Sequence, residues 1–322
     1  MKSRRDRRAV LGAALASAVV AASTAGMGYA LSGPPQGTPP VSSAVMPSAP
    51  AAGGGTSQVT QTATAAATAQ PSPVDRKALL ASAMAGVPVE DGARLSAAVL
   101  DVAGGEQAVY GDGSFDTASI VKVDILAALL LQAQDAGRAL TAGEKSYATA
   151  MIERSDNASA TALWASIGRA AGLDAANKRF GLTGTHGSDG ETWGLTQTTA
   201  ADQLVLLQQV FGTDSLLDAD SRGYLRGLME GIVDGQRWGV SAAGGGAAGA
   251  TGAAGTAWAL KNGWLPRSAT GLWDINSVGR VTVGGREFLV AVLSDGNSSQ
   301  QRGISMVERA AKAAVGSFDR AA

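Results

Sequence analysis

The distribution of charged residues along the chain limits where a folded domain can form. Residues 31–74 contain no charged residue and consist mainly of Pro, Ala, Ser, Thr, Gly and Gln. Such a segment cannot bury enough apolar surface to offset the conformational entropy that ordering it would remove. We therefore predict a disordered linker over residues 31–74. The folded domain is then confined to residues 75–322.

The first 30 residues have the pattern of a secretory signal. Five basic residues lie among the first eight, and an uncharged, mostly apolar run covers residues 9–30. Gly28 and Ala30 are small residues suited to cleavage after Ala30. The alternative is an uncleaved membrane anchor, because the run is long enough to span a bilayer. We expect export by the Sec or Tat route to the extracellular space or cell envelope, with the membrane contacted only through this segment.

Composition excludes several kinds of chemistry. The chain has no Cys and one His, His186, which rules out disulfides, a thiolate nucleophile and a multi-histidine metal site. Residues 75–322 carry 21 basic and 26 acidic groups, a balance that does not suit nucleic acid. We expect no metal, no cofactor and no nucleic-acid partner.

The order of predicted elements indicates an α/β (α+β) fold. Strands are expected at 94–102, 107–110, 257–260, 273–283 and 286–294, and helices at 75–85, 119–136, 143–164, 198–211, 218–231 and 299–315. Residues 242–255 form a Gly/Ala-rich loop. Strands at both ends with helices between them predict one antiparallel sheet, built from both termini and flanked by helices, with an inserted all-helical subdomain.

Lys122 is the most informative single residue. It lies near the start of the run 119–136, which is apolar on almost every face and therefore predicts a buried central helix. Burial disfavours an ammonium and lowers its pKa, so Lys122 is a candidate base. Ser119 lies three residues earlier on the same helical face and is a candidate nucleophile. The alternative is a Ser cap beside a lysine whose charged end reaches solvent.

Two further motifs favour the catalytic interpretation. Ser155-Asp156-Asn157 follows in the helical region, and Lys261-Asn262-Gly263 follows a short strand. The order S-x-x-K, S-D-N, K-[T/S]-G is the signature set of class A β-lactamases and penicillin-binding proteins. Residues 75–322 thus resemble the class A β-lactamase-like serine hydrolases.

The resemblance implies a role for each motif residue. Ser119 would be acylated, Lys122 would take or relay its proton, and Ser155 would protonate the leaving nitrogen beside Lys261. The resemblance also implies substrate-binding residues: Asn157 for a substrate amide, Asn262 and Gly263 on the strand, and Trp264, whose backbone N–H would complete an oxyanion hole with that of Ser119. The implied partner is a small-molecule β-lactam or a peptidoglycan stem peptide, and we expect a monomer.

The chain departs from the family pattern at two places. Asn262 replaces the usual Thr or Ser, and no Glu-Pro-x-x-Asn motif lies between Ser155 and Thr198. Glu191 is the possible deacylation base, against the alternative of a solvated loop carboxylate. Three functions stay open: hydrolysis of β-lactams, a D-Ala-D-Ala peptidase or penicillin-binding protein with slow deacylation, and a non-catalytic wall-binding module.

Overall fold

The computed structural model describes residues 74–244 and 257–319. The predicted signal at 1–30, the predicted linker except Val74, and residues 245–255 of the predicted Gly/Ala loop lie outside the described residues. The proposed division of the chain at residues 30 and 74 therefore stays a prediction. None of the helices in the described ranges combines the length and hydropathy that crossing a bilayer requires.

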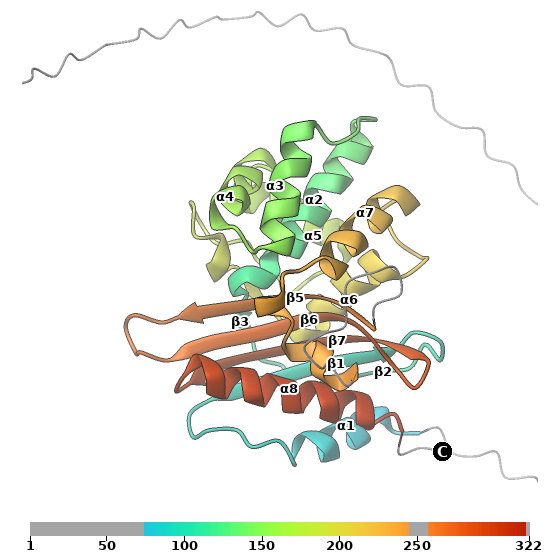
Figure 1. The fold of residues 1–322 in the computed structure, drawn as a ribbon, viewed down its shortest axis with the longest axis vertical. Helices are drawn as coiled ribbons and strands as arrows, with labels where there is room; N and C mark the ends of the chain where they lie inside the picture. The colour runs from blue at the N-terminus through green and yellow to red at the C-terminus, as the bar shows by residue number, and fades with distance from the viewer. Residues whose placement is uncertain (1–73, 245–256, 320–322) are drawn as a thin grey trace, which may run out of the picture. The chain divides into compact units, whose positions relative to one another are not determined.

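A five-stranded antiparallel sheet forms the framework, and its strands come from both ends of the folded part (Figure 1). Its order is β2-β1-β7-β6-β5. The bounds are β1 Arg94–Asp101, β2 Gln107–Tyr110, β5 Trp258–Pro266, β6 Trp273–Val283 and β7 Arg286–Asn297. Because β1 pairs directly with β7, the early and late strands form a single sheet, which confirms the predicted fold class.

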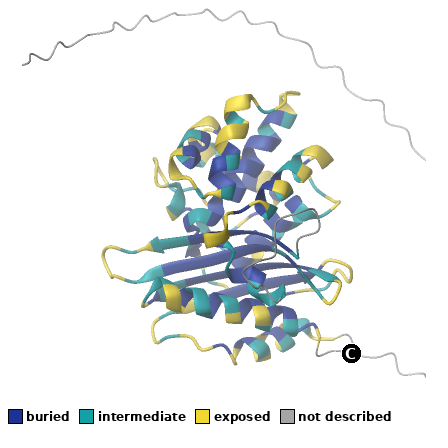
Figure 2. Ribbon diagram, in the orientation of Figure 1, coloured by how far each residue is buried: buried dark blue, intermediate teal, exposed yellow. Residues whose placement is uncertain are grey.

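The sheet is buried on both faces (Figure 2). Successive residues of β1 alternate between two apolar clusters: Ala97 and Val99 pack with α1 (Arg76–Met84) and α8 (Gln300–Gly316), whereas Ala98 packs into the larger helical core. The same alternation holds along β7. Strands covered on both sides read as continuous apolar runs, and this is the pattern of the β1 sequence.

The helices between β2 and β5 share one apolar core with α2 (Val121–Asp135). They are α3 Ala142–Glu153, α4 Asn157–Ser166, α5 Arg169–Phe180, α6 Ala200–Phe211 and α7 Ala219–Glu230. Eleven consecutive residues of α2, 121–131, are buried, as its lack of a polar face predicted.

Three local features were not predicted from the sequence. Helix α5 lies between Gly168 and Gly181, both with positive φ. A two-stranded sheet joins β3 (Phe115–Asp116) to β4 (Gln197–Thr198). Strand β5 is longer than expected and includes the Lys261-Asn262-Gly263 motif within the strand instead of after it. By contrast, the two-residue turn at Gly284-Gly285 agrees with the prediction, because both residues have the positive φ that such hairpins require.

Candidate active site

Ser119 lies in a short 3-10 turn, Ala118–Ile120, that leads directly into α2. Its neighbours Ala118 and Ile120 are buried, whereas Ser119 itself is partly exposed. Ala118 has a φ of 47°, a left-handed conformation that is unfavourable for a residue with a Cβ. The surrounding packing therefore maintains a strained backbone immediately before the serine, as is common at functional sites.

Strand β5 lies directly against this turn. A Cβ placed on Gly263 would lie 2.7 Å from the carbonyl oxygen of Thr117 and 2.8 Å from the backbone nitrogen of Ser119. Only glycine allows so close an approach of two backbones. This contact places the edge strand, with Gly263 and Trp264, beside the candidate nucleophile.

Lys122 is fully buried and donates three hydrogen bonds. Its Nζ lies 2.7 Å from the Ser155 carbonyl oxygen, 3.0 Å from Ser155 Oγ and 2.8 Å from Asn157 Oδ1. These three acceptors use all three protons of an ammonium. The Trp193 ring covers the same nitrogen at 4.9 Å from its centroid. Lys122 therefore links the first turn of α2 to the segment between α3 and α4.

Ser155 connects the two lysines. Its Oγ is 3.0 Å from Lys122 Nζ and 3.0 Å from Lys261 Nζ. Ser155 has a φ of 57°. The next residue, Asp156, caps helix α4, and its side chain accepts from the backbone nitrogen of Ser159. The break between α3 and α4 thus turns the serine hydroxyl toward both amines.

Burial lowers the pKa of both lysines. Desolvation lowers the pKa of Lys122 to about 7, although Asp156 nearby favours the charged form. Desolvation also holds the pKa of Lys261 well below its ordinary value, and the charge of Lys122 lowers it further. An amine that is partly neutral near pH 7 can accept a proton from a serine hydroxyl.

The Asn157 side chain is exposed to solvent, and its Oδ1 accepts a hydrogen bond from Lys122 Nζ. Its amide nitrogen is therefore oriented by this bond and can donate to a substrate carbonyl. The structure brings Lys122, Ser155, Asn157 and Lys261 together, and the roles expected for them stay predictions.

The contacts of Asn262 disagree with its predicted role. It is 1% exposed, and its Nδ2 donates to the carbonyl oxygens of Gln236, at 2.7 Å, and Trp238, at 3.0 Å. Both N–H donors are thus used inside the protein, and none remains for a substrate carboxylate. The reason is strand alternation: Asn262 lies on the face opposite Lys261 and Gly263.

Trp264 follows the same alternation. Its ring packs against the cluster beneath the sheet and lies 6.1 Å from the ring of Trp238. The indole is therefore not a wall of the site, and the role predicted for Trp264 concerns its backbone N–H alone. Trp193 is the tryptophan that contacts a site residue.

Glu191 is not placed as a base at this site. Its carboxylate forms an ion pair with Arg169 at 3.0 Å, and both side chains are 52% exposed. The alternative that the sequence allowed, a solvated loop carboxylate, describes this geometry. In the described part of the chain, no cluster of three or more His, Asp or Glu side chains could hold a metal ion.

Asn276 supports the site and was not identified from the sequence. Its Nδ2 donates to the carbonyl oxygens of Asp116 and Thr117, at 2.9 and 3.0 Å. These bonds join β6 to the segment just before Ser119. A single Asn within a strand matches no sequence motif. Its role becomes apparent only from the register of β6 against β5 and β7.

Comparison with protein families matches residues 137–318, more than half of the chain, to the beta-lactamase enzyme family. The matched range includes Ser155, Asn157 and Lys261, and it begins after Ser119 and Lys122. Comparison with curated proteins found no match.

Several solved structures have the same fold. One is an acyl-enzyme complex of a PBP-A mutant with penicillin G, with 21% identity and a TM-score of 0.62, covering 76% of this chain and 97% of that one. A beta-lactamase from Burkholderia vietnamiensis has 21% identity and a TM-score of 0.61, covering 78% and 98%. A class A beta-lactamase representative from Bacteroides cellulosilyticus has 15% identity and a TM-score of 0.63, covering 77% and 100%.

Proposed function

This chain belongs to the beta-lactamase enzyme family, and we propose that it is an exported serine hydrolase that forms an acyl-enzyme at Ser119 with β-lactams or related amides. The observation that carries the proposal is the position of Ser155 Oγ, 3.0 Å from Nζ of both Lys122 and Lys261. Two buried amines that share one hydroxyl form a path along which a proton can move from Lys122 through Ser155 to a leaving group.

The acylation step follows from this arrangement. Neutral Lys122 takes the proton of Ser119 as its oxygen attacks the carbonyl carbon. The backbone N–H groups of Ser119 and Trp264 stabilise the oxyanion. When the C–N bond breaks, Ser155 gives its proton to the leaving nitrogen and receives one from the Lys122 ammonium. Lys261 donates to the same Ser155 hydroxyl and holds it in place for this transfer.

Slow deacylation is the second candidate, and the position of Glu191 favours it. A carboxylate that is half exposed and paired with Arg169 does not hold a water against the acyl-enzyme. Penicillin would then remain bound to Ser119, as in the PBP-A complex with penicillin G. Such a protein would act on a D-Ala-D-Ala terminus and be blocked by β-lactams.

Acylation and turnover measurements separate these functions. Incubation with a fluorescent penicillin should add its mass to the peptide that contains Ser119, and Ser119→Ala should abolish labelling. Ser82→Ala, at an exposed position on α1, is the matched control and should label fully. Steady turnover of a chromogenic cephalosporin supports hydrolysis, whereas one-for-one labelling without turnover supports slow deacylation.

If no β-lactam labelled the protein, the proposed acylation of Ser119 would be contradicted. If it still bound peptidoglycan fragments, and Ser119→Ala and Lys122→Ala did not alter that binding, the fold would serve as a non-catalytic wall-binding module. The buried lysines argue against this outcome, because desolvating two amines is costly without a function that uses them.

Export is proposed from the sequence of residues 1–30. Fractionation of cells that express the full chain should place it outside the cytoplasm. Amino-terminal sequencing then distinguishes cleavage after Ala30 from a retained anchor. Recovery in the cytoplasm with an intact amino terminus would contradict the proposal.

A further inference from the structure

The third motif is hydrogen-bonded to a segment that follows α7. Asn262 Nδ2 donates to the carbonyl oxygens of Gln236 and Trp238. Gln236 is 9% exposed, and its Nε2 donates to the carbonyl oxygen of Arg154, at 3.1 Å. Arg154 directly precedes Ser155 in the chain. Asn262 and Gln236 therefore join strand β5 to the break between α3 and α4 that carries this serine.

Lys261 uses all of its N–H groups within the protein. Its Nζ lies 3.0 Å from Ser155 Oγ, 3.0 Å from the carbonyl oxygen of Asn262 and 3.4 Å from Gln236 Oε1. These three acceptors take the three protons that an ammonium carries. Lys261 is 1% exposed, and burial together with the charge of Lys122 holds its pKa well below the ordinary value. The amine therefore offers a substrate carboxylate neither a free donor nor a full positive charge.

The strand beside the motif contributes no cation at this point. Residues 261–264 of β5 pair with residues 275–278 of β6. The β6 residues are uncharged and buried: Ile275, Asn276, Ser277 and Val278. A carboxylate that leaves solvent must gain an opposite charge or hydrogen bonds, since its desolvation is otherwise costly. The side chains of Lys261 and Asn262 have no donor left for it.

We propose that the third motif of this chain is an internal clamp, in which Asn262 and Gln236 hold Lys261 against Ser155, and that the site takes substrates whose leaving portion carries no carboxylate. The clamp accounts for Asn at a position where Thr or Ser is usual. An amide has two N–H donors for the two carbonyl oxygens, whereas a hydroxyl has one.

The substrate class rests on the acyl-enzyme proposed above, and it narrows that function. The favoured substrates are amides and esters with a neutral leaving portion. A β-lactam would react through its ring, and its carboxylate would contribute little to the rate.

Benzylpenicillin and its methyl ester test the substrate class, because they share one reactive ring and differ in the carboxylate. Each acylation rate at Ser119 is divided by the rate at which hydroxide opens the same compound, which corrects for ring reactivity. A carboxylate held by hydrogen bonds would favour the acid by about 10–100-fold. A carboxylate that stays in solvent contributes at most about five-fold, as an exposed charge does.

The wild-type protein should therefore react with the acid and the ester at corrected rates within about five-fold of each other. A preference for the acid of about ten-fold or more would overturn the proposed substrate class.

The pKa of Lys261 tests the clamp without acylation. NMR of protein with isotope-labelled lysine measures it, and Lys261→Arg assigns the signal. Gln236→Glu replaces an oxygen that lies 3.4 Å from the amine by a carboxylate, so the measured pKa should rise by about 1–3. Gln301→Glu, at an exposed position on α8, is the matched control and should leave it unchanged. The same pKa in Gln236→Glu and wild type would overturn the clamp.

Asn262→Thr tests the other member of the clamp. The hydroxyl can bond one of the two carbonyl oxygens, so acylation by the acid and by the ester should slow together, by about three- to ten-fold. A faster reaction with the acid alone would show that position 262 faces the carboxylate, and it would overturn the proposal. A raised Lys261 pKa in Gln236→Glu, in a protein that neither compound acylates, would confirm the clamp and contradict the proposed function.

Discussion

Lys122 is fully buried and has a full set of hydrogen bonds, and these two properties have opposite effects on its charge. The three acceptors around its Nζ stabilise the ammonium, whereas the low polarity around it favours the neutral amine. The second effect prevails, since the pKa falls to about 7. A small change of pH near 7 therefore changes the fraction of Lys122 that is neutral and can act as a base.

The rate of Ser119 acylation should follow this pKa. Below about pH 7 Lys122 is mostly charged and cannot take the serine proton, so the rate should rise with pH through about 7 and then level off. Stopped-flow acylation with a fluorescent penicillin between about pH 5 and 9 measures it. Lys122→Arg, which stays charged, should be slower by about 10²–10⁴-fold at every pH. A wild-type rate independent of pH would exclude Lys122 as the base.

Glu191 should contribute little to deacylation. Its exposed pair with Arg169 is of a kind that contributes about 0–1 kcal/mol to stability. Release of the acyl group from Ser119 in Glu191→Gln, followed by mass spectrometry, should remain within about two-fold of wild type. A release at least ten times slower would show that the loop moves and brings this carboxylate to the acyl-enzyme.

Strand β5 shows why neighbouring motif residues do not share a role. Lys261 and Gly263 lie on the face toward Ser119, whereas Asn262 and Trp264 lie on the opposite face. The sequence placed all four in one motif, because the motif was recognised without knowing that it lies inside a strand. Once the strand is extended to Pro266, the period of two separates them.

The close contact at Gly263 leads to a prediction for this strand. In Gly263→Ala the new methyl would meet two backbone atoms at 2.7 and 2.8 Å, so β5 and the Ser119 turn must separate. A displacement of about 1 Å at a reacting centre costs on the order of 10²-fold in rate. Labelling by fluorescent penicillin should fall by that amount.

A second glycine provides the control. Gly223→Ala, in α7 with open space at the new methyl, should label normally and be stabilised by about 0.5–1 kcal/mol. Unimpaired labelling of Gly263→Ala would mean that the two backbones can move apart without displacing the serine.

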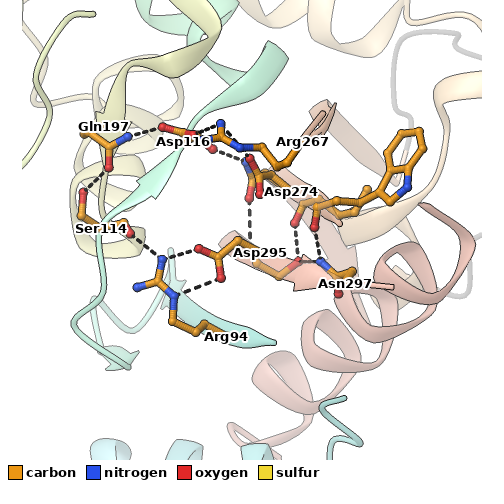
Figure 3. Close-up of polar contacts among 12 residues, drawn as sticks. Arg94, Ser114, Asp116, Gln197, Arg267, Asp274, Asp295 and Asn297 are labelled. Carbon is orange, nitrogen blue, oxygen red and sulfur yellow. Dashed lines mark hydrogen bonds and ion pairs between the residues drawn. The ribbon is translucent and has the colours of Figure 1, made fainter. Parts of the chain in front are cut away.

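At the scale of the whole molecule, the sequence predicted the overall arrangement of strands and helices better than the individual side-chain contacts that support the site. Apolar runs and ordered motifs predicted a single sheet from both ends and a central buried helix, because burial on both faces leaves a direct pattern in composition. The contacts of Asn276, and the charged cluster of Arg94, Asp116, Arg267, Asp274 and Asp295 shown in Figure 3, depend on strand register and on segments far apart in the chain. No local pattern in the sequence encodes such convergence. The two lysines are intermediate. The sequence shows a charged residue within an apolar segment, but it does not show which side chains that residue contacts.

Asp124 connects the buried core to the stability of the whole domain. It lies in α2, is 1% exposed, and both its carboxylate oxygens lack hydrogen-bond partners among the described residues, as does Gln203 Oε1. Burial raises its pKa to about 7, although the adjacent Gln203 side chain opposes the shift. The folded protein therefore holds a proton on the Asp124 carboxyl group more tightly than the unfolded chain does. Its contribution to stability is present below about pH 4 and is lost as the pH rises toward 7.

Asp124→Asn should remove this dependence. The amide cannot ionise, and its N–H groups can donate to Gln203 Oε1. We expect the variant to match wild type near pH 4 and to exceed it by about 2–4 kcal/mol at pH 8, because a shift of about three pKa units corresponds to about 4 kcal/mol. Urea unfolding at both pH values measures the difference, with Asp214→Asn as the exposed control. A difference between Asp124→Asn and wild type that is the same at both pH values would mean that Asp124 is ionised in the folded protein.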